Sequence, residues 1–322
     1  MRTRRNPAPV VLALIATITA AASWLCFRSL ETPPWDRNDL SRPAVKSAID
    51  KPLASSSAEF TPFTFITYNV KNWLVSYQAP EKTAEAKAAI IELLASGNPD
   101  VIGLCEIGSE NDVKEIQAKL KAAGFDLPHI YHTGGEDSIR HLAILSRFPI
   151  LSTERPDLRL QGLGQSMQRG ILDATLDIGG RPVRFIGLHL KSKRTVPDFD
   201  QAKIRLAEAR HARRHIDGIL AADPAAALVA YGDFNDTTRS LSTRAINGTY
   251  RTPGYLSHVH VRDSRGETWT HHYAVEDAYT RIDFVTISAG LRRHVKKDKS
   301  RIIDDPDWEI ASDHRPVLVR FE

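Results

Sequence analysis

Short apolar runs recur along the chain after about residue 60, and polar or turn-forming residues bound each of them. Runs of this kind are typical of β-strands that are buried on one or both faces. Two adjacent glycines, Gly179 and Gly180, predict a hairpin turn between two of the runs. We expect strands at residues 63–70, 101–107, 127–131, 139–145, 150–151, 171–178, 183–190, 225–231, 268–273, 281–288 and 316–321.

Between several of these runs the apolar residues change to helical spacing. A helix is expected at residues 80–95, where small and aliphatic residues recur at three- and four-residue steps. Ser109 is a typical N-cap for a second helix that extends to residue 123, and residues 200–220 predict a third helix. Strands that alternate with helices indicate an α/β protein built in layers.

The N-terminus has a different pattern. Arg2, Arg4 and Arg5 precede residues 7–27, which carry no charge. Residues 1–27 therefore predict a signal peptide, but the stretch is also long enough for an N-terminal membrane anchor, and both alternatives stay open. Residues 28–60 are rich in proline and serine and predict a disordered linker. We expect an exported protein, anchored to the membrane only if the segment is not cleaved.

Residues 61–322 are then expected to form one domain, because the candidate functional residues are spread over all of it. The formal charge of the whole chain is +4, and without the three arginines of the leader it falls to +1. A nearly neutral domain does not have the basic excess that is usual for sequence-independent DNA binding. One of the two cysteines lies in the leader, so no intramolecular disulfide is expected. A monomer is expected.

Polar residues follow the apolar run at 225–231. Asp233 and Asn235 are two positions apart, and residues two apart on a strand point to the same face. A carboxylate and a carboxamide on one face offer hard oxygen ligands of the kind that bind Mg²⁺, Mn²⁺ or Ca²⁺.

The same pattern occurs at the ends of other predicted strands. A sheet protein that gathers such residues at one rim is building a site. The residues are Asn69, Glu106, His189, Asp283, Asp313 and His314.

In this order, the segments TYNV, LCEIG, GLHLKS, GDFND, RIDFV and SDHRPV resemble the endonuclease/exonuclease/phosphatase superfamily, the DNase I-like hydrolases. The resemblance covers residues 63–322. It implies a metal-dependent phosphodiesterase or phosphatase on a four-layer α/β/β/α sandwich of two facing mixed sheets.

The resemblance also implies roles for the residues. Glu106 would be the primary metal ligand, with Asn69 and Asp313 completing the shell. Asp233 and Asn235 would hold the attacking water or a second ion. His314 would act as general base or polarise the phosphate, and Asp283 would orient the His314 ring. His189 would bind the phosphoryl oxygen or protonate the leaving group.

One position departs from the pattern of the DNase-like members. Where they carry a carboxylate that orients the first histidine, this chain has Arg140 and His141. Glu136 or Asp137 could take its place from the preceding loop. What fixes the ring of His189 therefore stays open.

The substrate is not decided by these residues. An extracellular nuclease, a sphingomyelinase-like lipid phosphodiesterase and a sugar- or inositol-phosphate phosphatase would all use them, and a catalytically silent binding protein could share the fold. Lys191, Lys193 and Arg194 directly follow His189 and predict a phosphate-attracting rim, which favours nucleic acid. The nearly neutral charge of the domain argues the other way.

Overall fold

The computed structural model describes residues 60–74, 80–194 and 200–322. They belong to one compact unit, Glu59–Glu322. The signal or anchor segment predicted at 1–27, and the linker up to residue 59, lie outside the described residues. Within the described part of the chain, no helix is both long enough and apolar enough to cross a membrane.

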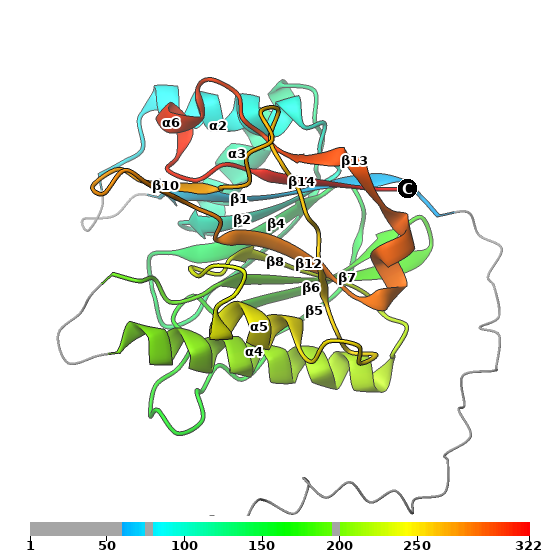
Figure 1. Ribbon diagram of the computed structural model, residues 1–322. Helices are drawn as coiled ribbons and strands as arrows, with labels where there is room; N and C mark the ends of the chain where they lie inside the picture. Colours follow the sequence, from blue (N-terminus) through cyan, green and yellow to red (C-terminus); the bar gives the residue numbers. More distant parts are fainter. Residues whose placement is uncertain (1–59, 75–79, 195–199) are drawn as a thin grey trace, which may run out of the picture. The chain divides into compact units, whose positions relative to one another are not determined.

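Two six-stranded sheets form the centre of this unit (Figure 1). The first has the order β13-β14-β1-β2-β4-β3, with β13 (Val295–Ile302), β14 (Val317–Phe321), β1 (Phe63–Trp73), β2 (Val101–Ile107), β4 (His141–Ser146) and β3 (His129–Thr133). The second has the order β5-β6-β7-β8-β12-β9, with β5 (Ile150–Glu154), β6 (Ile171–Ile178), β7 (Arg181–His189), β8 (Ala227–Asp233), β12 (Asp283–Ile287) and β9 (Ser257–His258).

Each sheet is mixed. β1 and β2 run parallel in the first sheet, as do β7 and β8 in the second, and the other pairs are antiparallel. Helices α2 (Ala84–Ser96) and α3 (Glu110–Ala122) pack on the outer face of the first sheet. Helices α4 (Gln201–Ala222) and α5 (Leu241–Asn247) pack on the outer face of the second. The expected four-layer α/β/β/α sandwich of two facing mixed sheets is confirmed.

The inner faces of the two sheets meet in an apolar core. The Phe65 ring packs against Phe185 and Tyr231, with centroids 5.2 and 4.8 Å apart. Gly103 of β2 faces Tyr231 so closely that a Cβ at this position would overlap the ring. Burying one such aromatic side chain contributes roughly 1.5–3 kcal/mol. This contact holds β2 against β8, and both strands end at the same rim.

Local polar groups decide where two of the helices begin. The first expected helix starts at Ala84 and not at residue 80, because the Thr83 side chain caps it by accepting from the Ala86 N–H. Ser109 and Asp112 form a reciprocal capping box at the start of α3, as the sequence predicts for Ser109.

No helix or strand was expected between residues 232 and 267, but this part of the chain contains α5 and β9. Ser240 caps α5 by accepting from the Thr243 N–H. The strand expected at 268–273 is reduced to β10 (His271–Tyr273), which pairs with β11 (Ala278–Thr280) in a separate hairpin that projects from the sandwich (Figure 1). The basic segment at 291–301 forms the end of a 3₁₀ helix, η2 (Ala289–His294), and most of the edge strand β13. A short helix, α6 (Trp308–Ala311), precedes β14.

Candidate active site

The strand pairing brings residues from six strands, or from the loops beside them, to one rim. In the second sheet, Asp233 at the end of β8 pairs with His189 of β7 on one side and with Asp283, the first residue of β12, on the other. In the first sheet, Asn69 of β1 pairs with Cys105, next to Glu106. The loop with Asp313 and His314 leads into β14, which is antiparallel to β1.

A cavity of about 690 Å³ opens at this rim. Asn69 and Asp283 are almost fully buried and lie beneath its surface. The other predicted site residues line it: Glu106, His189, Asp233, Asn235, Asp313 and His314. All eight residues that the sequence singled out are therefore in or directly under one cavity.

Asn69 links two carboxylates. Its Nδ2 donates to Asp233 Oδ2 at 3.1 Å and lies 3.4 Å from Glu106 Oε1. Its Oδ1 accepts from the Lys71 N–H at 3.0 Å. In this orientation the side chain presents hydrogen-bond donors to the two carboxylates, so it holds them in place from below.

Asp233 and Asn235 meet in a different way from the one expected. β8 ends at Asp233, and Asn235 lies beyond it with a φ of 51°, in the left-handed region. The Asn235 N–H donates to Asp233 Oδ1 at 2.8 Å, and its Nδ2 donates to Leu190 O at 2.9 Å. A tight turn, and not a shared strand face, therefore brings the two side chains together.

Buried negative charge is concentrated around Asp233. The pKa of Asp233 is raised to about 7, chiefly by burial; the charge of His314 lowers it, and the neighbouring Asp283 and Glu106 carboxylates raise it. A carboxyl with such a pKa is poorly compensated when ionised, and a bound cation would compensate it.

His314 and Asp283 form a close pair. His314 Nδ1 lies 2.8 Å from Asp283 Oδ2, and its Nε2 points toward Asp233 Oδ2 at 3.8 Å. Burial alone would lower the pKa of His314, but the charges of Asp283, Asp233 and Asp313 outweigh it and raise this pKa to about 10. The ring is therefore protonated at neutral pH and directs Nε2–H into the cavity.

Ser312 fixes the loop that carries this histidine. Its hydroxyl donates to Asn69 O at 2.9 Å and accepts from the His314 N–H at 3.1 Å. The imidazole of His271 lies beside the His314 ring at 4.6 Å between centroids. Burial and the His314 charge lower the pKa of His271 to about 4, so this second ring is neutral.

His189 is buried, with Nε2 3.5 Å from Asp233 Oδ2 and 3.8 Å from Glu106 Oε1. Burial, followed by the charge of Arg169, lowers its pKa well below the usual value. Among the described residues, no partner binds its Nδ1. Asp137 accepts from two backbone N–H groups and pairs with Arg140 and Arg169 instead, so within these residues no carboxylate replaces the one found in DNase-like members.

The donor set fits a divalent cation. Side-chain atoms of Asp233, Asp283 and His314 lie within 4.8 Å of one another, although the hydrogen bond between the last two already accounts for their closeness. Glu106 and Asp313 line the same cavity. Carboxylate oxygens of this kind bind Mg²⁺, Mn²⁺ or Ca²⁺.

Basic side chains surround the acidic centre. Lys191 and Arg194 of the expected phosphate-attracting rim line the cavity, whereas Lys193 pairs with Asp236 at 3.1 Å and does not line it. Three further cations of this lining were not predicted to lie here: one is in β1, one is just before β4 and was named only as a departure from the family pattern, and one is in the loop before β6. These are Lys71, Arg140 and Arg169.

Comparisons with known proteins agree with this arrangement. The model of the Endonuclease/Exonuclease/phosphatase family matches residues 66–314. No curated protein matches the sequence.

Solved structures share the fold at low sequence identity. Truncated Caenorhabditis elegans TDP2 is 18% identical over 81% of this chain and 97% of its own, with a TM-score of 0.56. The human Nocturnin catalytic domain is 16% identical over 82% and 95%, with a TM-score of 0.59. A family protein from Bacteroides thetaiotaomicron is 18% identical over 82% and 100%, with a TM-score of 0.57.

Proposed function

The chain belongs to the endonuclease/exonuclease/phosphatase family, whose members hydrolyse phosphoester bonds, and from this premise we propose that it is an exported, Mg²⁺-dependent phosphodiesterase that acts on nucleic acid. The observation that carries the substrate class is the set of cations around the acidic centre. A polyanion offers one phosphate after another to such a rim, whereas a small phosphomonoester uses only one or two of the cations.

Glu106 and Asp313 would hold the metal ion, with Asp233 facing the same space. The ion would relieve charge on the phosphoryl oxygens and on the leaving oxygen. Asn69 would keep the Glu106 and Asp233 carboxylates at their positions through its amide N–H groups.

The protein side chains divide the remaining work. Ionised Asp233, fixed by Asn69 and by the Asn235 N–H, accepts the proton of the attacking water. The protonated His314 ring donates to a phosphoryl oxygen, and Asp283 keeps that ring oriented. Neutral His189 lies deep in the cavity and binds a phosphoryl oxygen through Nε2–H. As the new P–O bond forms, the bond to the leaving oxygen breaks; this oxygen takes a proton from solvent, and Asp233 later returns its proton to solvent.

A lipid phosphodiester is the second candidate, because apolar side chains project beside the site. The β10–β11 hairpin is joined to the catalytic loop by a bridge between His271 and His314. Around it, Tyr273, Val275 and Tyr279 are 46%, 82% and 49% exposed. Large exposed side chains of this kind suit the surface of a membrane or micelle. The hairpin is the projecting segment at the left of Figure 1.

A substrate panel tests the proposal. The purified chain is assayed on plasmid DNA, a small phosphodiester, sphingomyelin vesicles and a sugar phosphate, each with Mg²⁺, Mn²⁺ or EDTA. The nucleic-acid proposal expects metal-dependent cleavage of DNA at a higher kcat/KM than for the other three substrates. Preference for vesicles would support the lipid candidate, and preference for the sugar phosphate would overturn both.

Export and the N-terminal boundaries are part of the proposal. We infer a signal peptide or anchor at 1–27 and a linker at 28–60, followed by the catalytic domain at 61–322. Fractionation of cells that make a tagged full-length chain should find it in the membrane or outside the cytoplasm. A cytoplasmic protein that retains residues 1–27 would contradict this inference.

A further inference from the structure

A second pocket lies at the edge strands of the two sheets. Its walls come from the segment after β9, from Arg281 just before β12, and from β13. It shares no lining residue with the catalytic cavity. Its volume of about 360 Å³ is within the range of small-molecule pockets, roughly 300–1,000 Å³.

The backbone that forms this pocket is held on both sides. The Val259 N–H donates to Val285 O of β12 at 2.9 Å, and the Ile302 N–H of β13 donates to Arg262 O at 3.0 Å. The connecting segment therefore crosses from the edge of one sheet to the edge of the other. Because both ends are hydrogen-bonded to strands, the pocket walls are in place before anything binds.

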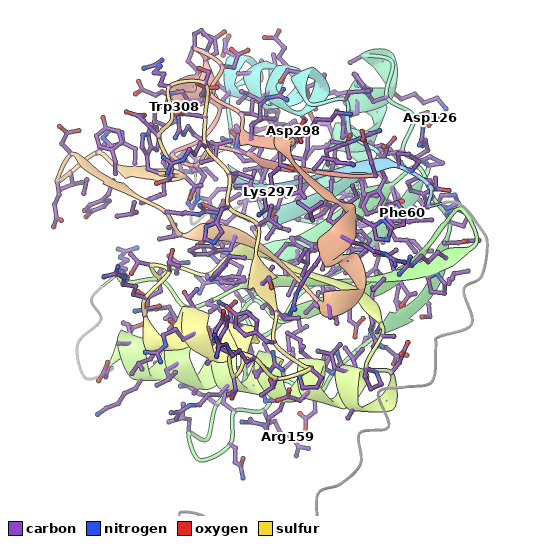
Figure 2. All side chains as sticks on the ribbon, turned by 45° about the vertical axis from the view of Figure 1, so that its right-hand side comes forward. Phe60, Asp126, Arg159, Lys297, Asp298 and Trp308 are labelled. Carbon is purple, nitrogen blue, oxygen red and sulfur yellow. The ribbon has the colours of Figure 1, made fainter. Side chains whose placement is uncertain are left out.

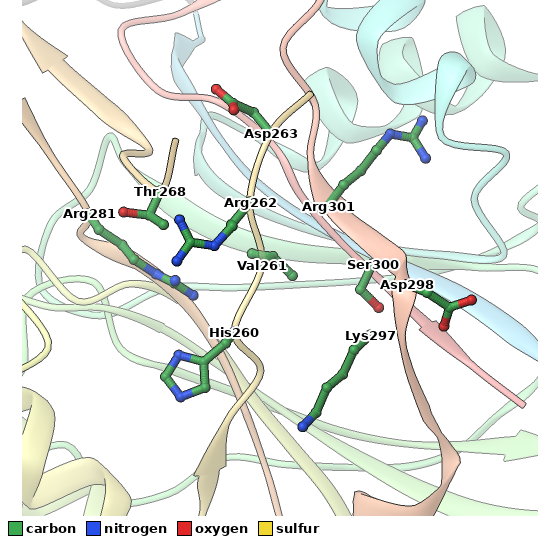
Figure 3. A pocket seen from close by; sticks show the side chains of 10 residues that line it. All are labelled: His260, Val261, Arg262, Asp263, Thr268, Arg281, Lys297, Asp298, Ser300 and Arg301. Atoms are coloured by element: carbon green, nitrogen blue, oxygen red, sulfur yellow. The ribbon is translucent and has the colours of Figure 1, made fainter. Parts of the chain in front are cut away.

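Five basic residues line this pocket, and one of them, Arg301, points away from the other four (Figure 3). Figure 3 shows the guanidinium groups of Arg262 and Arg281 close together, with His260 and Lys297 on the same side of the hollow. The pKa of His260 reflects these positive neighbours. Burial lowers this pKa, and the charges of Arg281 and Lys297 lower it further. Burial lowers the pKa of Arg281; the Asp283 carboxylate opposes this, and the charge of Arg262 lowers the pKa further.

The two acidic residues of the lining do not neutralise this charge. Asp263 Oδ2 accepts from Arg315 Nη1 at 2.8 Å in a fully buried pair. Asp298 points to the other side of β13 (Figure 3), and Figure 2 shows it with Lys297 on this exposed strand. Among the described residues, Lys297 has no ion-pair partner, so the pocket carries an uncompensated positive charge.

Arg281 also has an unused donor. Its Nη2 donates to Val259 O at 3.0 Å, and its guanidinium lies over the Phe284 ring at 5.3 Å. Its Nε is buried and has no hydrogen-bond partner within the described part of the chain. A buried donor without a partner costs about 1–3 kcal/mol, and an oxyanion in the pocket would remove that cost.

We propose that this pocket binds a phosphate group. Two guanidinium groups offer planar, charge-assisted donors to phosphate oxygens, and the Lys297 ammonium adds a further positive charge and rotatable donors. The group could arrive as inorganic phosphate or as part of a small phosphomonoester, and the chemistry of recognition is the same. The site is separate from the catalytic cavity and does not depend on the metal or on the proposed substrate.

The test is a calorimetric titration of the purified full chain in EDTA. Inorganic phosphate is the ligand in one series and glycerol 3-phosphate in a parallel series. Wild type should show two binding components. Arg262→Ala with Lys297→Ala should weaken one of them about tenfold or more and leave the other unchanged, because each lost charge-assisted contact is costly. Lys191→Ala with Arg194→Ala changes the catalytic cavity instead. This variant should weaken the other binding component and leave the first one unchanged.

Lys296→Ala is the control for the Lys297 change, since it removes one positive charge from the same strand without touching the pocket lining. Tighter binding of glycerol 3-phosphate would assign the pocket to phosphomonoesters, and equal binding would assign it to free phosphate; either supports the proposal. If the Arg262/Lys297 variant binds as Lys296→Ala does, or if both double variants lose the same component, the proposal is wrong. Displacement by chloride at equal concentration would mean an adventitious ion only and would also overturn it.

Discussion

The imidazole of His314 is held by the carboxylate of Asp283, Nδ1 to Oδ2, at 2.8 Å, with both side chains almost fully buried. The pair joins the loop before β14 in one sheet to the first residue of β12 in the other. It therefore bridges the two halves of the sandwich at the point where the chemistry is expected.

Asp283→Asn should lower kcat by up to about 10⁴-fold, the loss seen when a carboxylate that orients a catalytic histidine is replaced by its amide. Because Asp283 raises the pKa of His314, the variant should also shift the alkaline limb of the pH–rate profile to lower pH. Steady-state kinetics across pH would show both effects. A lower kcat with an unmoved alkaline limb would mean that Asp283 is only structural.

Glu106→Gln removes one charge at nearly constant volume. If Glu106 is the primary ligand, the variant should need much more Mg²⁺ and lose more than about a hundredfold in kcat/KM at limiting metal, beyond the effect typical of groups that only support a ligand. The thermal unfolding midpoint in EDTA should be close to that of wild type. Wild-type activity at limiting Mg²⁺ would assign the role to another carboxylate.

Asp233→Asn should separate stability from activity. The folded-state pKa of Asp233 is raised to about 7, from an ordinary value of 3.8. The folded protein therefore keeps this proton to a higher pH than the unfolded chain does. Without metal, this group makes the free energy of unfolding decrease as pH rises from about 4 to 7, by at most about 1.4 kcal/mol per pH unit.

In EDTA at pH 7.5, Asp233→Asn should therefore be more stable than wild type, although it is inactive. Urea unfolding at pH 4, 5.5 and 7.5 measures the slope. An unchanged slope in the variant would show that Asp233 is compensated in some other way.

Lys191→Ala with Arg194→Ala should weaken the binding of DNA. The slope of log K against log salt concentration should become less steep by about 1–2, since each lost phosphate contact removes about 0.9 from it. Lys193→Ala is the control from the same segment, because Lys193 pairs with Asp236 and does not line the cavity. Turnover of a small phosphodiester should fall less than turnover of DNA in the double variant, and should be unchanged in the control. Equal losses on DNA and on the small substrate would argue against a polyanion.

Gly103→Ala and Gly218→Ala should move stability in opposite directions. A methyl at Gly103 overlaps the Tyr231 ring, so this variant should lose about 1–3 kcal/mol. Gly218 lies in α4 with nothing near its Cβ position, so alanine there should gain about 0.5–1 kcal/mol through helix propensity. Denaturant unfolding of the two variants would compare them, and a stable Gly103→Ala would mean that the sheets can move apart.

The site residues at the strand ends could be predicted from the sequence. The length of an apolar run shows which residue stands at the end of a strand, and the pairing of the strands brings these ends to one rim. Asn69, Glu106 and His189 were found in this way. The turn at Asn235 was not, since its geometry depends on a backbone in the left-handed region and not on strand alternation.

The cations of the rim were only partly found, for a related reason. Lys191 directly follows a motif residue, so its place could be inferred. Arg169 reaches the cavity from a loop whose course is set by contacts with other parts of the chain. The helix α5 was missed because it is short and its cap, Ser240, lies in a segment that is rich in polar residues.

The pairing of β1 with β14, Phe63 opposite Phe321, has a consequence for biosynthesis. During translation, β1 leaves the ribosome before β14. The edge of β1 that pairs with β14 therefore stays unpaired until β14 has been made. His314 reaches Asp283 only when that strand is in place. We therefore expect that a nascent or truncated chain that lacks β14 does not assemble this pair, and that the proposed activity appears only after β14 has been made.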